Sequence, residues 1–207
     1  MSRSTIILLK TITWIACLWP LGILIWGAVA NQLGPDPIAH ITFTTGSTTL
    51  NLLTITLAVT PVRRIIKPLG WIGPWRRLFG LFAFFYGTLH LFTYIALYAG
   101  FNEHAMADDI AKRRFITMGL IAWLLLVPLA ATSFNWAIRK MGGKRWKQLH
   151  RLIYVAAVCG IIHYWWQVKP GVLSPMTNTI ILAVLLALRP VLDWIQHRKP
   201  RAAYSRT

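Results

Sequence analysis

Residues 78–102 read LFGLFAFFYGTLHLFTYIALYAGFN, a stretch of 25 residues without a single Lys, Arg, Asp or Glu. A helix needs about 20 apolar residues to cross the hydrocarbon core of a bilayer. This stretch is long enough to do so, and two arginines, Arg76 and Arg77, directly precede it. The sequence therefore predicts a transmembrane helix over about residues 78–99.

Similar uncharged runs account for most of the remaining chain. They occupy residues 11–35, 37–62, 115–138, 152–168 and 170–188. The polar residues 42–49 predict that the second helix begins only near residue 48, after an irregular outer loop over residues 31–46. We expect an all-α fold, a polytopic membrane helix bundle that forms a single domain over residues 1–207. The expected spans are about 11–30, 48–62, 78–99, 115–137, 149–168 and 174–194, with a basic tail over 198–207.

The composition argues against soluble proteins and nucleic-acid-binding proteins. The chain is 56% hydrophobic and only 13% charged, whereas soluble domains carry about 25% charged residues. Its net charge of +17 would suit nucleic acid, but the basic residues lie in short groups between uncharged runs. No nucleotide-binding motif is present, and there is no room for a dinucleotide-binding domain. The expected surroundings are membrane lipid, and the chain cannot take hydride from a nicotinamide by itself.

The distribution of Lys and Arg predicts the orientation. The N-terminus, the 63–77 loop, the 139–151 loop and the tail from Arg189 hold eighteen of the 22 basic residues, and the other three loops hold four. Basic loops stay on the cytoplasmic side of a membrane. We therefore expect a multi-pass membrane protein with both termini in the cytoplasm.

Two histidines lie deep in the third and fifth predicted spans. His90 is thirteen residues beyond Arg77, and His163 is twelve beyond Arg151. At about 1.5 Å per residue, both lie roughly 18–20 Å from the inner surface. Ionisable residues inside a membrane are costly and indicate functional sites. Facing each other at one level, the two imidazoles would be able to hold a haem iron from opposite faces; the alternative is that each is a neutral histidine bonded to a neighbouring helix.

Each of these histidines follows a glycine by three positions. Gly87 precedes His90, and Gly160 precedes His163. A helical side chain leans back over the preceding turn, so the glycines would leave space for a flat ring bound to the imidazole. Small residues also serve helix packing, but the matched pair favours haem. Because no Cys-x-x-Cys-His motif is present, that haem would be a non-covalent b-type haem.

A second candidate group lies at the inner membrane edge. His150 has Trp146 and Lys147 on the preceding turn, so its sequence leaves no cleared face. It would be a one-sided ligand of a second, inner haem, part of a flavin or quinone site, or an interfacial histidine bonded to headgroups. Arg76 and Arg77 lie at the same level. They would pair with haem propionates or a flavin phosphate, or serve only as membrane anchors.

Two segments carry a family resemblance. Residues 76–94 contain RRLFGL, His90 and Tyr94, and residues 146–166 contain WKQLHRLIY followed by HYWW. They resemble the haem-binding membrane subunit of the bacterial periplasmic protein-methionine-sulfoxide reductase system, within the ferric-reductase-like transmembrane group. Residues 33–37 and 60–64 add weaker support. The similarity covers nearly the whole chain, although residues 41–46 depart from the outer-loop pattern through which a partner would be contacted.

The resemblance implies a cytochrome of the bacterial inner membrane, with b-type haem and FMN. Such a subunit passes electrons from the quinone pool or a cytoplasmic flavin reductase to a periplasmic molybdopterin reductase that repairs oxidised methionines. By position, its haem ligands would be His90 and His163, with His150 as a third haem-associated histidine. We therefore expect an electron-transfer subunit without catalytic residues of its own, not a complete enzyme. The alternatives are a generic quinol-linked or ferric-reductase-like membrane cytochrome b, and a redox-silent scaffold or transporter.

Overall fold

The computed structural model describes residues 3–168 and 174–198, and these residues form helices and no strand. The predicted all-α fold is therefore confirmed. Residues 199–207, most of the predicted basic tail, lie outside the described residues. The helices are α1 (Arg3–Val29), α2 (Pro37–Ile65), the 3-10 helix η1 (Lys67–Ile72), α3 (Trp75–Thr93), the π-helical turn η2 (Tyr94–Tyr98), α4 (Glu103–Lys112), α5 (Arg114–Ala131), α6 (Asn135–Met141), α7 (Gly143–Leu149), α8 (Leu152–Gln167) and α9 (Ser174–Arg198).

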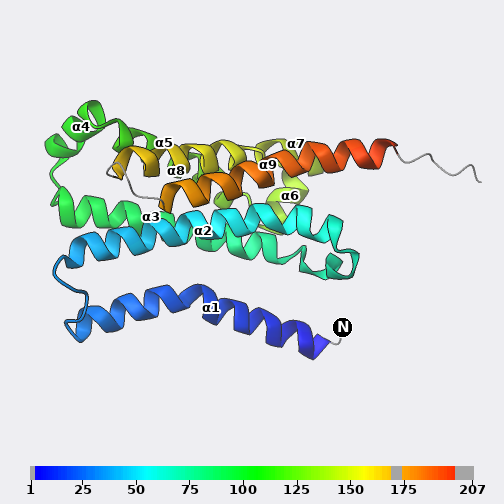
Figure 1. Ribbon diagram of the computed structural model, residues 1–207, viewed down its shortest axis with the longest axis horizontal. Helices are drawn as coiled ribbons and strands as arrows, with labels where there is room; N and C mark the ends of the chain where they lie inside the picture. Colours follow the sequence, from blue (N-terminus) through cyan, green and yellow to red (C-terminus); the bar gives the residue numbers. More distant parts are fainter. Residues whose placement is uncertain (1–2, 169–173, 199–207) are drawn as a thin grey trace, which may run out of the picture.

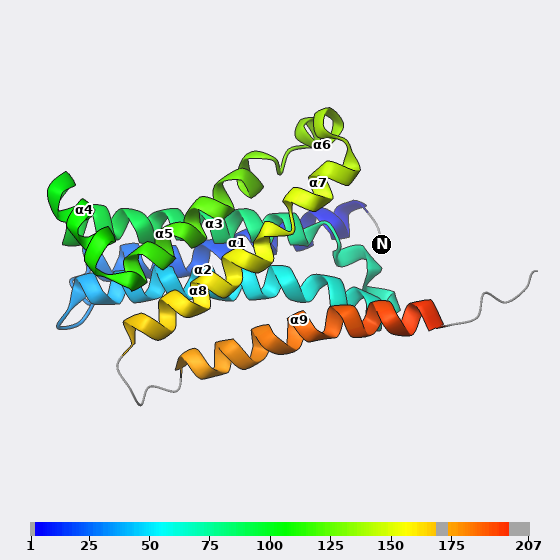
Figure 2. The same ribbon diagram turned by 90° about the horizontal axis from the view of Figure 1, so that it is seen from above.

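Six long helices run side by side along the longest axis of the molecule. Figure 1 shows α1 on one side, α2 and α3 in the middle, and α5, α8 and α9 on the other side. The short helix α4 lies at one end of the bundle, here named the α4 end. The opposite end, here named the basic end, holds η1, α6 and α7 together with the first and last described residues (Figures 1 and 2).

Four of the long helices are long and apolar enough to cross a membrane, namely α1, α3 with its π-helical turn, α5 and α9. They confirm a polytopic membrane protein. The remaining two, α2 and α8, coincide with the second and fifth predicted spans, but α2 is rich in threonine and α8 has only 16 residues. The count of six spans and the cytoplasmic position of both termini stay predictions, although both described ends do lie at the same end of the bundle.

The start of α2 differs from the prediction. The irregular loop expected to reach residue 46 is wrong, because α2 already begins at Pro37. The carboxylate of Asp36 accepts a hydrogen bond from the backbone N–H of Ala39 (3.0 Å), and proline suits the first helical turn. The hydroxyls of Thr42 and Thr45 each donate to the carbonyl four residues earlier, at 2.8 Å. Since the helix itself accepts these protons, the threonines need no water and remain in a buried helix.

The connection between α2 and α3 agrees with the prediction that residues 61–77 cannot form one regular helix. α2 ends at Ile65, the six residues of η1 follow, and α3 begins only at Trp75. This break turns the chain back, so that α3 packs closely along α2.

Two closely packed helix pairs form the centre of the bundle, α2 with α3 and α5 with α8. Ala83 on α3 and Ala156 on α8 are fully buried, and such small side chains let neighbouring helices approach closely. Tyr86 attaches α1 to this centre. Its hydroxyl donates to the carbonyl of Cys17 (2.7 Å) and accepts from the backbone N–H of Leu21 (3.2 Å). The outer faces of the helices are apolar and exposed, as contact with lipid requires.

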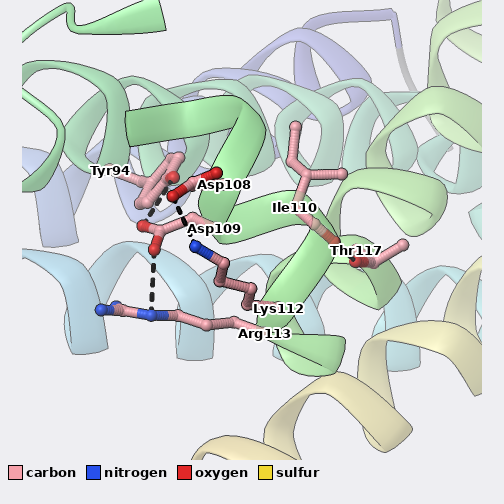
Figure 3. A network of polar contacts seen from close by, with 7 residues as sticks. All are labelled: Tyr94, Asp108, Asp109, Ile110, Lys112, Arg113 and Thr117. Atoms are coloured by element: carbon pink, nitrogen blue, oxygen red, sulfur yellow. Dashed lines mark hydrogen bonds and ion pairs between the residues drawn. The ribbon is translucent and has the colours of Figure 1, made fainter. Parts of the chain in front are cut away.

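At the α4 end, the turn η2 and helix α4 are joined by a polar network. Asp109 accepts a hydrogen bond from the hydroxyl of Tyr94 (3.0 Å) and pairs with Arg113 (3.0 Å), while Lys112 pairs with Asp108 (2.6 Å) (Figure 3). Lys112 and Arg113, two of the few basic residues in the loops expected outside, are therefore paired with neighbouring carboxylates. The network fixes α4 over the end of the helix that carries His90.

Candidate functional site

His90 on α3 and His163 on α8 meet inside the bundle. Their ring centroids lie 5.9 Å apart, and their ring planes are nearly perpendicular, at 85°. The two residues come from different helix pairs, so the packing of one pair against the other brings them together. The two histidines expected at one depth from the sequence thus lie next to each other.

Both histidines are bonded to backbone carbonyls through Nδ1. The Nδ1 atom of His90 lies 3.0 Å from the carbonyl oxygen of Thr42 on α2, and that of His163 lies 2.6 Å from the carbonyl oxygen of Phe115 on α5. A carbonyl oxygen only accepts, so Nδ1 carries the proton in each bond. The other ring nitrogen, Nε2, then keeps its lone pair free to bind a metal.

The separation of the two rings fits a single metal ion between them. A metal–imidazole bond is about 2.0–2.1 Å long, so two imidazoles on opposite sides of one metal have centroids roughly 6.4 Å apart. The observed 5.9 Å is slightly shorter, so a small outward movement of the rings would admit a metal ion between them. Within the described residues, no group of three or more His, Cys, Asp or Glu side chains would hold a metal ion. Two neutral imidazoles alone suit a metal that brings its other ligands with it, as haem iron does.

Two glycines that the sequence analysis did not single out lie directly behind these rings. A Cβ atom on Gly46 of α2 would lie 2.9 Å from Cε1 of His90, and one on Gly119 of α5 would lie 2.7 Å from Nδ1 of His163. Gly46 was missed because it was expected in a loop. The sequence shows only that each glycine lies 44 residues before its histidine, and this spacing acquires a meaning once the helices are packed.

The glycines that were predicted from sequence have other neighbours. A Cβ atom on Gly87 would meet Thr49 at 3.4 Å, and one on Gly160 would meet Leu50 at 3.8 Å. Both glycines therefore face α2, where their small size allows close helix packing. Their role in leaving space for a haem ring stays a prediction.

A second site opens at the basic end, as a cavity of about 710 Å³. This volume lies within the range of cofactor and ligand sites. His150, Arg76 and Arg77 all line it, so three residues predicted from different parts of the sequence come together. Three basic residues that the prediction did not include line it as well: Lys10, Arg63 and Arg64. Such a surplus of positive charge suits an anionic group such as a phosphate or a propionate.

His150 is held differently from the two deep histidines. The hydroxyl of Thr132 donates to the carbonyl of Pro128 (2.6 Å), so it accepts from Nε2 of His150 (3.1 Å). One ring face of His150 is covered by Trp146, with centroids 3.9 Å apart. The imidazole proton of His150 is therefore on Nε2, and Nδ1 is the ring nitrogen with the free lone pair. In the two deep histidines Nε2 would bind a haem iron, whereas in His150 the same ring nitrogen is bonded to the hydroxyl of Thr132.

Within the described residues, Arg76 and Arg77 of this cavity have only uncharged hydrogen-bond partners. Arg77 donates to the side-chain oxygen of Asn135 (2.8 Å), and Arg76 makes a long contact with the hydroxyl of Thr60 (3.5 Å). Nearby, Arg64 is paired with Asp193 of α9 (2.6 Å). The charges of Arg76 and Arg77 are therefore available to a bound anion.

Comparison with known proteins identifies the family. Residues 45–161 match the family described as ferric reductase like transmembrane component. The protein-methionine-sulfoxide reductase heme-binding subunit MsrQ of Herminiimonas arsenicoxydans is 44% identical over 203 residues, which cover 97% of this chain and 93% of that protein. The subunits of the same name from Rhodospirillum rubrum and Bordetella pertussis are 46% and 37% identical, and each match covers 90% or more of both chains.

These matches extend over nearly the whole bundle and include both helix pairs. They confirm the family suggested by the segments around His90 and His163, and they agree with a multi-pass membrane protein. The chain belongs to the MsrQ family, within the ferric-reductase-like transmembrane group.

Proposed function

We propose that this protein is a transmembrane electron-transfer subunit that binds one b-type haem between His90 and His163. The observation that carries the proposal is the pair of imidazoles at 5.9 Å, each with Nδ1 bonded to a carbonyl. The relatives are named as heme-binding subunits, and this pair supports the same role here. When bound, the haem iron supplies a one-electron carrier that alternates between the ferric and ferrous states.

The protein's own residues hold and shield this carrier. Nε2 of His90 and Nε2 of His163 would hold the haem, which would then serve to carry electrons rather than to bind oxygen. The bundle around the site would limit the access of water, and a low dielectric environment is one of the factors that set the potential of a haem. Held by both histidines, the haem would transfer electrons without carrying out a reaction on a substrate.

The expected acceptor is a periplasmic molybdopterin reductase of oxidised protein methionines. The relatives' names assign them to a protein-methionine-sulfoxide reductase, and the proposed orientation puts the α4 end toward the periplasm. Reduction of one sulfoxide to thioether and water consumes two electrons and two protons. The subunit would therefore deliver two electrons in succession for each repaired methionine.

The cavity at the basic end is the proposed entry for electrons. A haem at the deep site lies roughly 18–20 Å from the inner surface, a long single step for an electron from the cytoplasm. A relay cofactor in the cavity, FMN or a second haem, would divide that step. Arg76 and Arg77 would bind its phosphate or propionates, and His150 would contact its ring. The donor would be a cytoplasmic flavin reductase; the alternative is quinol from the membrane pool, which would reach the deep haem directly.

A difference spectrum tests this function. Detergent-purified protein should show a Soret band and the reduced-minus-oxidised bands of a low-spin b-type haem. The main signal should be lost in His90→Ala and His163→Ala and retained in His104→Ala, which removes an exposed histidine of α4. If the wild-type protein contained no haem, the remaining interpretation would be a redox-silent scaffold or transporter. Haem without co-purification of the periplasmic reductase would instead favour a generic membrane cytochrome b.

A further inference from the structure

The two deep histidines occupy sockets built in the same way. Each Nδ1 atom contacts a carbonyl that lies 48 residues earlier, that of Thr42 for His90 and that of Phe115 for His163. One helical turn after each carbonyl stands a glycine, Gly46 on α2 and Gly119 on α5. The same carbonyl–glycine–histidine arrangement therefore occurs once in each of the two central helix pairs.

The glycines are the reason the rings can approach the helix backbone. A Cβ atom on Gly46 would lie 2.9 Å from Cε1 and 3.0 Å from Nδ1 of His90. One on Gly119 would lie 2.7 Å from Nδ1 and 2.9 Å from Cε1 of His163. These distances are well below the 3.5–4.0 Å of an ordinary contact. Any side chain at either position would push the imidazole away from its carbonyl.

The carbonyls fix both the proton and the rotation of each ring. A helix carbonyl cannot turn to follow a side chain, so the imidazole must turn until Nδ1–H points at it. The proton on Nδ1 sets the tautomer, and the direction of the bond sets the ring plane. The two sockets thereby hold the ring planes at 85° to each other.

We propose that Gly46 and Gly119 are positioning residues for the haem ligands. They seat His90 and His163 against the carbonyls of Thr42 and Phe115, so that both Nε2 atoms face one iron with nearly perpendicular ring planes. This inference rests on the proposed haem site. It predicts a spectroscopic property. When the planes of the two imidazoles that bind the iron are perpendicular, the two iron dπ orbitals that the imidazoles affect are nearly equal in energy. A ferric low-spin haem of this kind gives a strongly anisotropic electron paramagnetic resonance (EPR) signal.

The test compares alanine at four glycines. Gly46→Ala and Gly119→Ala place a methyl group against a ring. Gly22→Ala meets nothing within 4 Å, and Gly80→Ala meets Thr56 at 3.7 Å. All four lie in helices, where alanine is the better helix former, so backbone propensity favours folding in every variant. We expect haem affinity to fall by about 10- to 100-fold in Gly46→Ala and Gly119→Ala only, the range for loss of a histidine's outer partner.

Two further readouts separate positioning from simple loss of packing. In the fraction that retains haem, Gly46→Ala and Gly119→Ala should reduce the anisotropy of the EPR signal and shift the midpoint potential. Both quantities should equal the wild-type values in Gly22→Ala and Gly80→Ala. Full haem occupancy with wild-type EPR signal and potential in Gly46→Ala and Gly119→Ala would overturn the inference.

The outcomes also distinguish this inference from the proposed function. If the wild-type protein holds no haem, or holds a haem that remains in His90→Ala and His163→Ala, the proposed haem site is wrong. If instead the haem is lost in both histidine variants and all four glycine variants behave alike, only the positioning role is wrong. Should Gly46→Ala and Gly119→Ala fail to fold, pulsed EPR on the wild-type protein decides. Both axial imidazoles should carry a slowly exchanging proton on the remote nitrogen, and a ligand without that proton would overturn the inference.

Discussion

The two histidine sites of this protein differ in nearly every physical property. At the deep site, Nδ1 of His90 and Nδ1 of His163 are each bonded to a backbone carbonyl, and no hydrogen bond to either Nε2 atom is found among the described residues. At the basic end, the edge and one face of His150 are already occupied by Thr132 and Trp146, and arginines line the cavity beside it. We propose that the first site holds a metal between two imidazoles and that the second site holds an anionic group. A histidine in a membrane helix is therefore identified by its partners rather than by its depth alone.

The largest effect on haem content is expected from substitution of His90 and His163, which tests the difference between the two histidine sites. We expect the double variant His90→Ala/His163→Ala to lose the main haem signal completely, because no other described side chain replaces either ligand. His150→Ala should keep that signal. Haem quantification on detergent-purified protein, with membrane insertion checked separately, measures both. Full haem retention in the double variant would contradict the assignment.

The next effect concerns the basic end. His150→Ala, and separately the pair Arg76→Ala/Arg77→Ala, should slow reduction of the deep haem by a cytoplasmic flavin reductase. A hydrogen bond to a charged group contributes about 1.5–3 kcal/mol, so losing one weakens binding of a phosphate by roughly 10- to 100-fold. Stopped-flow reduction measures the rate, and a quinol analogue serves as the second donor, for which a smaller effect is expected. If the rates of reduction by the flavin reductase were unchanged in both variants, His150, Arg76 and Arg77 would be interpreted as membrane anchors.

Much of the architecture was readable from the sequence. Uncharged runs longer than about 20 residues locate membrane helices because the bilayer offers no water to a charged group. The shared level of His90 and His163 followed from counting residues from the basic ends. The start of α2 was misjudged because a threonine counts as polar in the sequence but bonds to its own helix in the structure. Hydropathy alone does not register that bond.

The close contacts behind the histidines were not readable in the same way. The glycine nearest to His90 in sequence, Gly87, faces α2, whereas the glycine that touches its ring, Gly46, lies on another helix. Helical spacing predicts neighbours within one helix, but it says nothing of which residue a second helix brings against a ring. The packing of α2 on α3 and of α5 on α8 decided these contacts.

A smaller effect tests the glycines next to the histidines in sequence. Gly87→Leu and Gly160→Leu should each reduce haem content more than Gly80→Leu does, if the space that they leave is used by the haem ring. Leucine is a good helix former, so a loss of haem would point to lost space. Haem content per purified protein is the measurement. Equal content in the three variants would assign Gly87 and Gly160 to helix packing against α2 alone.

The smallest effect is expected far from either site. Tyr86→Phe removes the hydroxyl that joins α3 to Cys17 and Leu21 of α1. Loss of such hydrogen bonds costs about 1 kcal/mol each, so thermal unfolding in detergent should begin at a lower temperature. The haem spectrum should stay as in the wild-type protein, since α1 contributes no ligand. A changed spectrum would show that the position of α1 affects the deep site.

The most direct test of the central claim is the low-temperature EPR spectrum of the oxidised wild-type protein and its single histidine variants. The account predicts a low-spin ferric signal with strong anisotropy, from two imidazoles at 85°, that disappears in His90→Ala and in His163→Ala and persists in His150→Ala. A signal that survives in both His90→Ala and His163→Ala would contradict the claim that these two residues hold one haem.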